Sequence, residues 1–145
     1  MHDVPRQLTS EQLTELFEGD TALVRRLAER DDPLGSAREV IQELSEEEKL
    51  EALNAHPAIG ARNLSSRSAA EQGGDTDPAI LTELAYQNQI YEEKFGFRFV
   101  VFVNRRPKTE ILDVLRERLQ RPREEELDTA LEELVAIAED RWRTS

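Results

Sequence analysis

Phe-Gly-Phe-Arg-Phe-Val-Val-Phe-Val, residues 95–103, is the stretch that decides the fold class, because its aromatic and β-branched composition is locally typical of a buried strand. The rest of the chain offers no second convincing strand to pair with it. A lone strand would leave a row of unpaired backbone groups. We therefore predict an extended or helix-terminal segment that passes through a helical core, with backbone groups that bond elsewhere and are available to a ligand.

Outside this stretch, apolar residues recur mainly at steps of three and four, which is the period of amphipathic helices. Capping-box spacing at Thr9 and at Ser45 indicates two helix starts, and Asp77 followed directly by proline indicates a third. Pro122 separates the last two apolar stripes. The sequence therefore predicts an all-α fold, a single-domain helical bundle-like arrangement over residues 1–145 with one extended apolar segment through its core.

The scarcity of histidine and cysteine narrows the chemistry that this chain could perform. Its 145 residues include no cysteine and two histidines, His2 and His56. A thiolate nucleophile, a disulfide framework, a cysteine-based zinc site and a three-histidine zinc site are all excluded, and we predict no metal site. Because His2 directly follows the first Met, any catalytic imidazole in the folded body has to be His56.

Charge and hydropathy limit the partners. The chain has 19 basic and 31 acidic residues, a formal net charge of −12, which repels phosphate backbones, so a nucleic acid partner is not expected. The longest apolar run, residues 99–103, is far too short to span a bilayer, and the first residues do not resemble a signal peptide. We therefore expect no membrane association and a cytoplasmic location.

His56 and Pro57 form the first candidate functional segment. Pro57 disfavours the α region for His56, and Gly60 allows a turn shortly afterwards. A histidine held at such a helix terminus can project into a cleft and transfer protons near neutral pH. The alternative is that His56 only caps or packs the helix end.

Ser68, Glu71 and Gln72 form the second candidate segment. On a helix these residues lie at i, i+3 and i+4 and share one face, where they present a hydroxyl, a carboxylate and an amide together. This set suits hydrogen bonding to a polar heterocycle. The alternative is that Ser68 and Glu71 form an ordinary capping box.

Arg141 is the third candidate, on the helix whose apolar stripe ends at Trp142. In a chain this acidic, an arginine that points inwards would be a natural clamp for an anionic substrate. The alternative is a surface arginine that pairs with an acidic neighbour such as Glu133 or Glu139.

Several motifs, taken together in their order and spacing, resemble those of the 2-oxo-4-hydroxy-4-carboxy-5-ureidoimidazoline (OHCU) decarboxylase family. The resemblance covers nearly the whole chain and is strongest between residues 56 and 119. Its motifs are His56-Pro57-x-x-Gly60, Ser68-x-x-Glu71-Gln72-Gly73, Tyr91-x-x-Lys94-Phe95-Gly96-Phe97-x-Phe99-Val100, Ile111-Leu112 and Arg118-Leu119.

This resemblance implies an all-α, cofactor-free and usually dimeric enzyme of urate catabolism. Such an enzyme converts OHCU, a small anionic ureidoimidazoline, to (S)-allantoin and carbon dioxide. Two alternatives remain: a non-catalytic helical binding module on the same scaffold, and a decarboxylase that acts on a related ureido compound.

The resemblance also implies roles for individual residues. His56 matches the catalytic histidine, and Glu71 would orient either His56 or the substrate. The other implied substrate contacts are Pro57, Ser68, Gln72, the stretch from Phe99 to Val101, and Arg141, for which Arg143 is the alternative.

Several stretches depart from the family pattern. Arg98 stands where the family often has proline, and residues 31–36 replace a familiar Arg-Pro-Phe-x-Ser type of segment. The glycine-rich turn continues with the more acidic residues 74–77, and Trp142 follows Arg141 where the family commonly has leucine.

Overall fold

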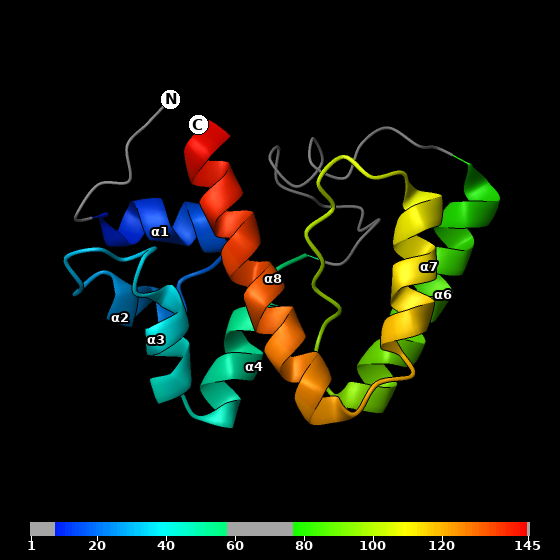
Figure 1. Cartoon of the computed structure of the whole chain (residues 1–145), viewed down its shortest axis with the longest axis horizontal. Helices are drawn as coiled ribbons and strands as arrows, with labels where there is room; N and C mark the ends of the chain where they lie inside the picture. Colours follow the sequence, from blue (N-terminus) through cyan, green and yellow to red (C-terminus); the bar gives the residue numbers. More distant parts are fainter. Residues whose placement is uncertain (1–7, 58–76, 145) are drawn as a thin grey trace.

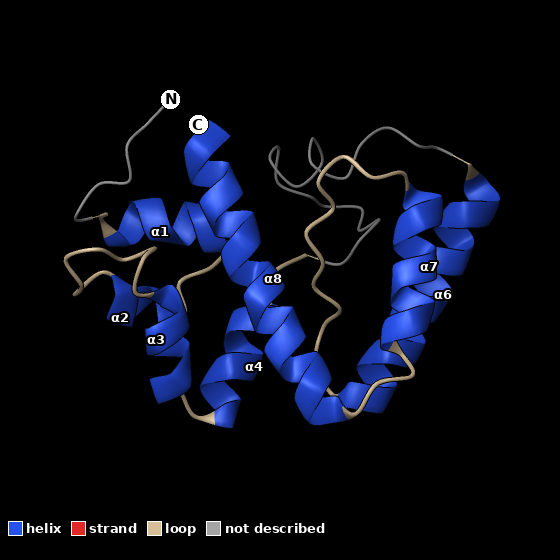
Figure 2. Cartoon of the chain, viewed as in Figure 1, coloured by secondary structure: helices blue, strands red, loops and turns tan. Residues whose placement is uncertain are grey.

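The computed structural model describes residues 8–57 and 77–144. The described residues form helices joined by loops, with no strand among them (Figure 2), which confirms the all-α prediction. The helices are α1 (Ser10–Phe17), α2 (Ala22–Leu27), α3 (Ala37–Glu43), α4 (Glu46–Asn54), α6 (Pro78–Phe95), α7 (Lys108–Arg118) and α8 (Arg123–Thr144).

The helix starts follow the capping signals in the sequence. The side chains of Thr9 and Ser45 each accept a hydrogen bond from the backbone N–H three residues on, and both capping boxes are complete. The Asp77 side chain accepts from the N–H of Ala79, 3.0 Å away, at the start of α6. These local interactions satisfy backbone donors that have no partner inside the helix.

Helix α8 runs through the middle of the molecule (Figure 1). Helices α1, α3 and α4 pack against it, and α2 packs against those three helices. On the other side, α6 and α7 pack against each other and run in the same direction, because the segment between them leads back to the end where α6 begins (Figure 1). The buried face of α8 is mainly apolar, with Leu131, Leu134 and Ala138 among its members.

The segment that follows α6 has no regular secondary structure and lies between α8 and the pair formed by α6 and α7 (Figure 1). Gly96 ends α6 with a φ of +83°, a left-handed conformation that glycine adopts without a Cβ penalty. Beyond it, Phe97, Phe99, Val100 and Val101 are all buried. The prediction of an extended apolar segment through a helical core is therefore confirmed.

Side chains from the surrounding elements bond the backbone of this segment in place of a neighbouring strand. Three arginines donate to its carbonyl groups and one carboxylate accepts from an N–H, so these backbone groups are satisfied without a sheet. The bonds are Arg118 Nη1 to Val100 O at 2.8 Å, Arg106 Nη2 to Phe102 O at 2.6 Å, Arg123 Nε to Phe95 O at 2.8 Å, and Phe102 N to Glu133 Oε1 at 3.3 Å.

A buried polar network connects this segment to three helices. Glu126 of α8 is fully buried, and its Oε1 accepts from the hydroxyl of Tyr91 at 2.6 Å and from Nε of Arg118 at 2.7 Å. The Arg118 guanidinium also lies 4.6 Å from the ring centroid of Phe99. Burial, followed by the hydrogen bond to Glu126, raises the pKa of Tyr91, so this hydroxyl stays protonated and keeps donating.

None of the described helices is long and apolar enough to cross a membrane.

Candidate active site

His56 lies just beyond the end of α4. The helix ends at Asn54, and the N–H of His56 still donates to the carbonyl of Leu53 at 3.2 Å. The His56 side chain is buried, and its Nδ1 has no hydrogen-bond partner in the part of the chain that the structure describes. A buried ring nitrogen without a partner is unusual and is open to a ligand.

Arg141 of α8 points inwards. It is 1% exposed, and its Nη1 donates to the carbonyl of Leu16 and to Oε1 of Glu18, both at 3.1 Å. Arg141 is therefore not a surface arginine, although it does pair with an acidic residue, which is Glu18 instead of Glu133 or Glu139. Burial of a guanidinium requires charge and hydrogen-bond partners, which the end of α1 supplies here.

The two acidic neighbours named in that alternative have other partners. Glu139 pairs with Arg38 at 3.4 Å, and Glu133 accepts from the backbone N–H of Phe102. Arg143, the other candidate arginine, is exposed at the end of α8. Of the two arginines, Arg141 is thus the one directed into the molecule.

Charges from three elements bear on the His56 imidazole. Burial, followed by the positive charge of Arg141, lowers the pKa of His56 to about 4, and Arg98 adds to the effect, while the carboxylate of Glu18 opposes it. The imidazole is consequently neutral at physiological pH. A neutral imidazole has a nitrogen lone pair and can accept a proton.

The extended segment reaches the same place. Arg98 Nη1 donates to the carbonyl oxygen of His56 at 2.7 Å. Two further predicted site residues, Phe99 and Val101, are buried in the apolar core. The structure thus brings His56, Arg141 and the extended segment towards one region, in which Pro57 is half-buried.

Ser68, Glu71 and Gln72 lie outside the described residues, so their predicted roles remain predictions. They come after His56 and Pro57 in the chain, within the stretch 58–76.

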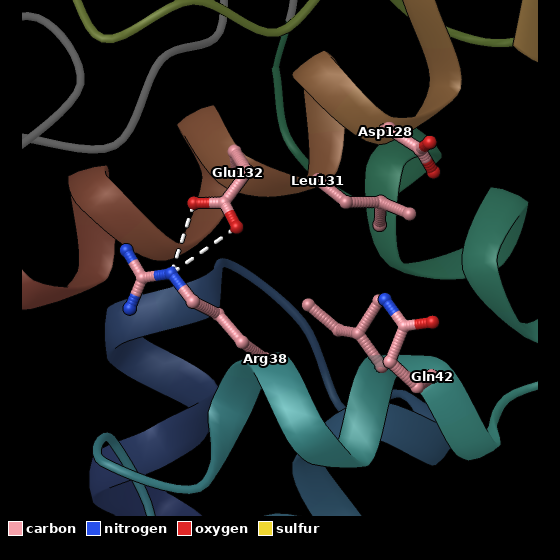
Figure 3. A pocket seen from close by; sticks show the side chains of 6 residues that line it. Arg38, Gln42, Asp128, Leu131 and Glu132 are labelled. Carbon is pink, nitrogen blue, oxygen red and sulfur yellow. Dashed lines mark hydrogen bonds and ion pairs between the residues drawn. The ribbon is translucent and has the colours of Figure 1, made fainter. Parts of the chain in front are cut away.

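A shallow hollow of about 230 Å³ lies elsewhere, between α3 and α8 (Figure 3). Arg38 at its edge already has Glu132 as a partner, with Nε to Oε2 at 2.9 Å. The hollow contains none of the predicted site residues, so it is not the candidate active site. Its lining residues are Arg38, Ile41, Gln42, Asp128, Leu131 and Glu132.

Two residues beside His56 were not predicted as part of the site. Glu18 is the C-cap of α1 and has a φ of +65°, a position that sequence periodicity does not mark as functional. Arg98 is visible in the sequence as a departure from the family pattern, but its contact with His56 depends on the tertiary structure.

Comparison with known proteins identifies the family. The model of the family "OHCU decarboxylase" matches residues 3–143. The chain belongs to this family. Two relatives of the decarboxylase family agree with this assignment, one by sequence and one by structure.

The 2-oxo-4-hydroxy-4-carboxy-5-ureidoimidazoline decarboxylase of Haloferax volcanii is 33% identical over 115 residues, which cover 74% of this chain and 68% of that protein. A crystal structure of OHCU decarboxylase in the presence of (S)-allantoin matches with a TM-score of 0.75 and 28% identity, over 90% of this chain and 94% of that chain.

Longer relatives also contain a region similar to this decarboxylase-family chain. The uric acid degradation bifunctional protein TTL of Arabidopsis thaliana is 36% identical over 100 residues, 62% of this chain but only 31% of that protein. In the bifunctional protein of Bacillus sp. the matched region is 21% of the length. The chain therefore spans about a fifth to a third of these bifunctional relatives.

Proposed function

We propose that this chain decarboxylates OHCU to (S)-allantoin in urate degradation, with His56 as the proton-transfer group. Membership of the OHCU decarboxylase family supports the reaction. The observation that carries the role of His56 is its buried, neutral imidazole, whose Nδ1 has no hydrogen-bond partner among residues 8–57 and 77–144, close to a buried arginine.

The reaction breaks the bond between the ring carbon and its carboxylate, and carbon dioxide leaves. The electron pair of that bond moves towards the neighbouring ring carbon, and the C=N unit of the substrate accepts the displaced electrons. The substrate thereby supplies its own electron sink. The protein then has to hold the leaving carboxylate and move protons.

His56 accepts the proton of the substrate hydroxyl, and this group becomes the ketone of allantoin. The hydroxyl proton and one proton taken up from solution end on the ring nitrogen of the former C=N unit and on the carbon next to the new ketone, where the C–H bond forms. An anion bound beside Arg141 offsets the positive charge that lowers the pKa of His56. Substrate binding therefore raises this pKa towards the working pH, where a general base is most effective.

Arg141 holds an anionic part of the substrate. This interaction offsets the repulsion between an anion and a chain of net charge −12. The remaining contacts follow the family resemblance. Glu71 orients His56 or the ureido nitrogens, Ser68 and Gln72 bind amide-like edges, and Pro57, Phe99 and Val101 line the apolar side of the pocket.

The test is the decay of freshly prepared OHCU, followed by circular dichroism at the absorption of allantoin with and without the protein. Uncatalysed decay yields racemic allantoin, so an optically active product reports catalysis. We expect His56→Asn to abolish the acceleration while the helical circular dichroism is retained. His2→Ala, which removes the other imidazole of the chain, is the matched control and should keep full activity.

Other results would contradict parts of this proposal. Full activity in folded His56→Asn protein would remove His56 from the mechanism. No change in rate or optical activity with wild-type protein would favour a helical binding module on the same scaffold. Activity on another ureido compound but not on OHCU would indicate a related decarboxylase.

We further propose that the chain acts as a homodimer in the cytoplasm and without a cofactor, as the family resemblance and the composition imply. Light scattering coupled to size-exclusion chromatography would test the dimer, because a mass near 16.6 kDa instead of twice that value would contradict it.

A further inference from the structure

Arg98 joins the extended segment to the end of α4 through three hydrogen bonds. Its Nη1 donates to the carbonyl oxygens of His56 at 2.7 Å and Asn54 at 3.3 Å. Its backbone N–H donates to Oδ1 of Asn54 at 3.0 Å. One residue thus fixes the position of the last residues of α4 relative to the segment that crosses the core.

The end of α4 needs such a partner. The last carbonyl groups of a helix have no partner within the helix, and cationic groups stabilise this end of the helix dipole. The last turn of α4 contains no basic residue, and Pro57, which follows His56, has no N–H to donate. Arg98 supplies both the donor and the positive charge from a segment more than 40 residues away.

The Arg98 side chain also faces a carboxylate. Its Nε lies 3.8 Å from Oε1 of Glu92 on α6, an ion-pair distance that is too long for a hydrogen bond, and the side chain is 29% exposed. The two carbonyl groups at the end of α4 therefore supply the hydrogen bonds that orient this planar guanidinium.

We propose that Arg98 is a positioning residue, which holds the backbone of His56 so that its imidazole faces the substrate. This inference rests on the proposed role of His56 in proton transfer. Arg98 itself does not contact the reacting atoms; it acts through the His56 carbonyl. A displacement of about 1 Å in such a group is enough to reduce a rate by up to ~100-fold.

Arg98 also contributes to the electrostatic environment of His56. Among the described residues, the charges that bear on this imidazole are Arg141 from α8, Glu18 from the end of α1 and Arg98 from the extended segment, while Glu92 of α6 faces Arg98. Loss of the Arg98 charge therefore raises the pKa of His56, whereas a lysine at this position keeps it low.

The test compares Arg98→Met with Arg98→Lys. For Arg98→Met we expect kcat for (S)-allantoin formation to fall about tenfold with KM within about twofold, because the group is misplaced while substrate contacts remain. Arg98→Lys, which retains a charge and a donor, should recover most of this loss. Arg116→Met is the matched control, since it removes an arginine whose ion pairs, with Glu83 of α6 and with Asp113 of its own helix, are exposed.

A second readout does not depend on catalysis. In a His2→Ala background His56 is the only imidazole, so its pKa can be measured directly by NMR titration of the ring. We expect this pKa to rise in Arg98→Met and to stay near the wild-type value in Arg98→Lys and Arg116→Met. If Arg98→Met loses its helical circular dichroism, Arg98→Gln removes the charge, keeps a donor and should show the same rise.

The outcomes separate this inference from the proposed function. An active wild-type protein with unchanged kcat and unchanged His56 pKa in Arg98→Met would overturn the role of Arg98 alone. An inactive wild-type protein would overturn the proposed function, and the positioning of His56 for catalysis would fall with it. A kcat loss that is equal in Arg98→Lys and Arg98→Met, without any change in the His56 pKa, would also overturn the positioning role of Arg98.

Discussion

Acidification should destabilise this protein through the protonation of His56. The pKa of this imidazole falls from an ordinary value of 6.5 to about 4 in the folded protein, because of burial and the nearby Arg141. As pH falls, the unfolded chain therefore binds a proton on His56 before the folded protein does. The free energy of unfolding therefore decreases as pH falls from about 6.5 to about 4, and the loss is complete below that range.

The magnitude follows from the difference between the two pKa values. At about 1.4 kcal/mol per pKa unit, this group alone removes ~3 kcal/mol from the free energy of unfolding once both states are protonated. Between pH 7 and pH 5 the loss is about 2 kcal/mol. A loss of this size is a large share of the 5–15 kcal/mol typical of a folded domain.

The assay is urea unfolding of the wild-type protein and of His56→Asn at pH 7 and pH 5, followed by far-ultraviolet circular dichroism. Carboxylates titrate in both proteins, so their contribution cancels in the difference. We expect the wild-type protein to lose about 2 kcal/mol more than His56→Asn between the two pH values. His2→Ala should behave like the wild-type protein, and equal losses in all three proteins would refute the reasoning.

Three further changes test the structure away from His56. Glu126→Leu should lower the free energy of unfolding by about 3–5 kcal/mol in urea titrations, because it leaves buried Arg118 without its ion pair. The double variant Glu126→Leu with Arg118→Met should be less destabilised than Glu126→Leu alone. Gly96→Ala should cost about 1 kcal/mol by thermal unfolding, because its φ of +83° disfavours a Cβ although nothing blocks the space; an unchanged melting temperature would argue against this φ. Ser45→Ala should also cost about 1 kcal/mol, through loss of a capping bond, whereas Ser45→Thr should be nearly neutral.

Three of the helix starts were predictable because they depend on residues two or three positions apart. Thr9, Ser45 and Asp77 cap α1, α4 and α6 through their own side chains, and no long-range contact is needed to define these ends. The absence of a second strand-like stretch in the sequence similarly predicted that residues 95–103 would not form a sheet, and among the described residues they do not.

The partners of that extended segment were not predictable from the sequence. Two of its carbonyl groups bond to Arg118 and Arg123 on α7 and α8, and neither arginine has a local signal that distinguishes it from an exposed arginine; the third donor, Arg106, is in the same connection. A long, flexible cation bonds whichever acceptor the packing brings near it. Only the packed chain shows which arginines have this role.

At the candidate site, too, the sequence determined some features and the tertiary structure determined others. Composition alone limited the candidate imidazoles to His2 and His56, and His56 is the one that lies among the described residues. Only the tertiary structure decided that Arg141 faces inwards, since its bond to Leu16 joins residues 125 positions apart. It likewise placed Glu18 and Arg98 around the imidazole. The sequence specifies which reactive group is present. Its charge state, however, depends on burial and on neighbours that packing brings from distant parts of the chain.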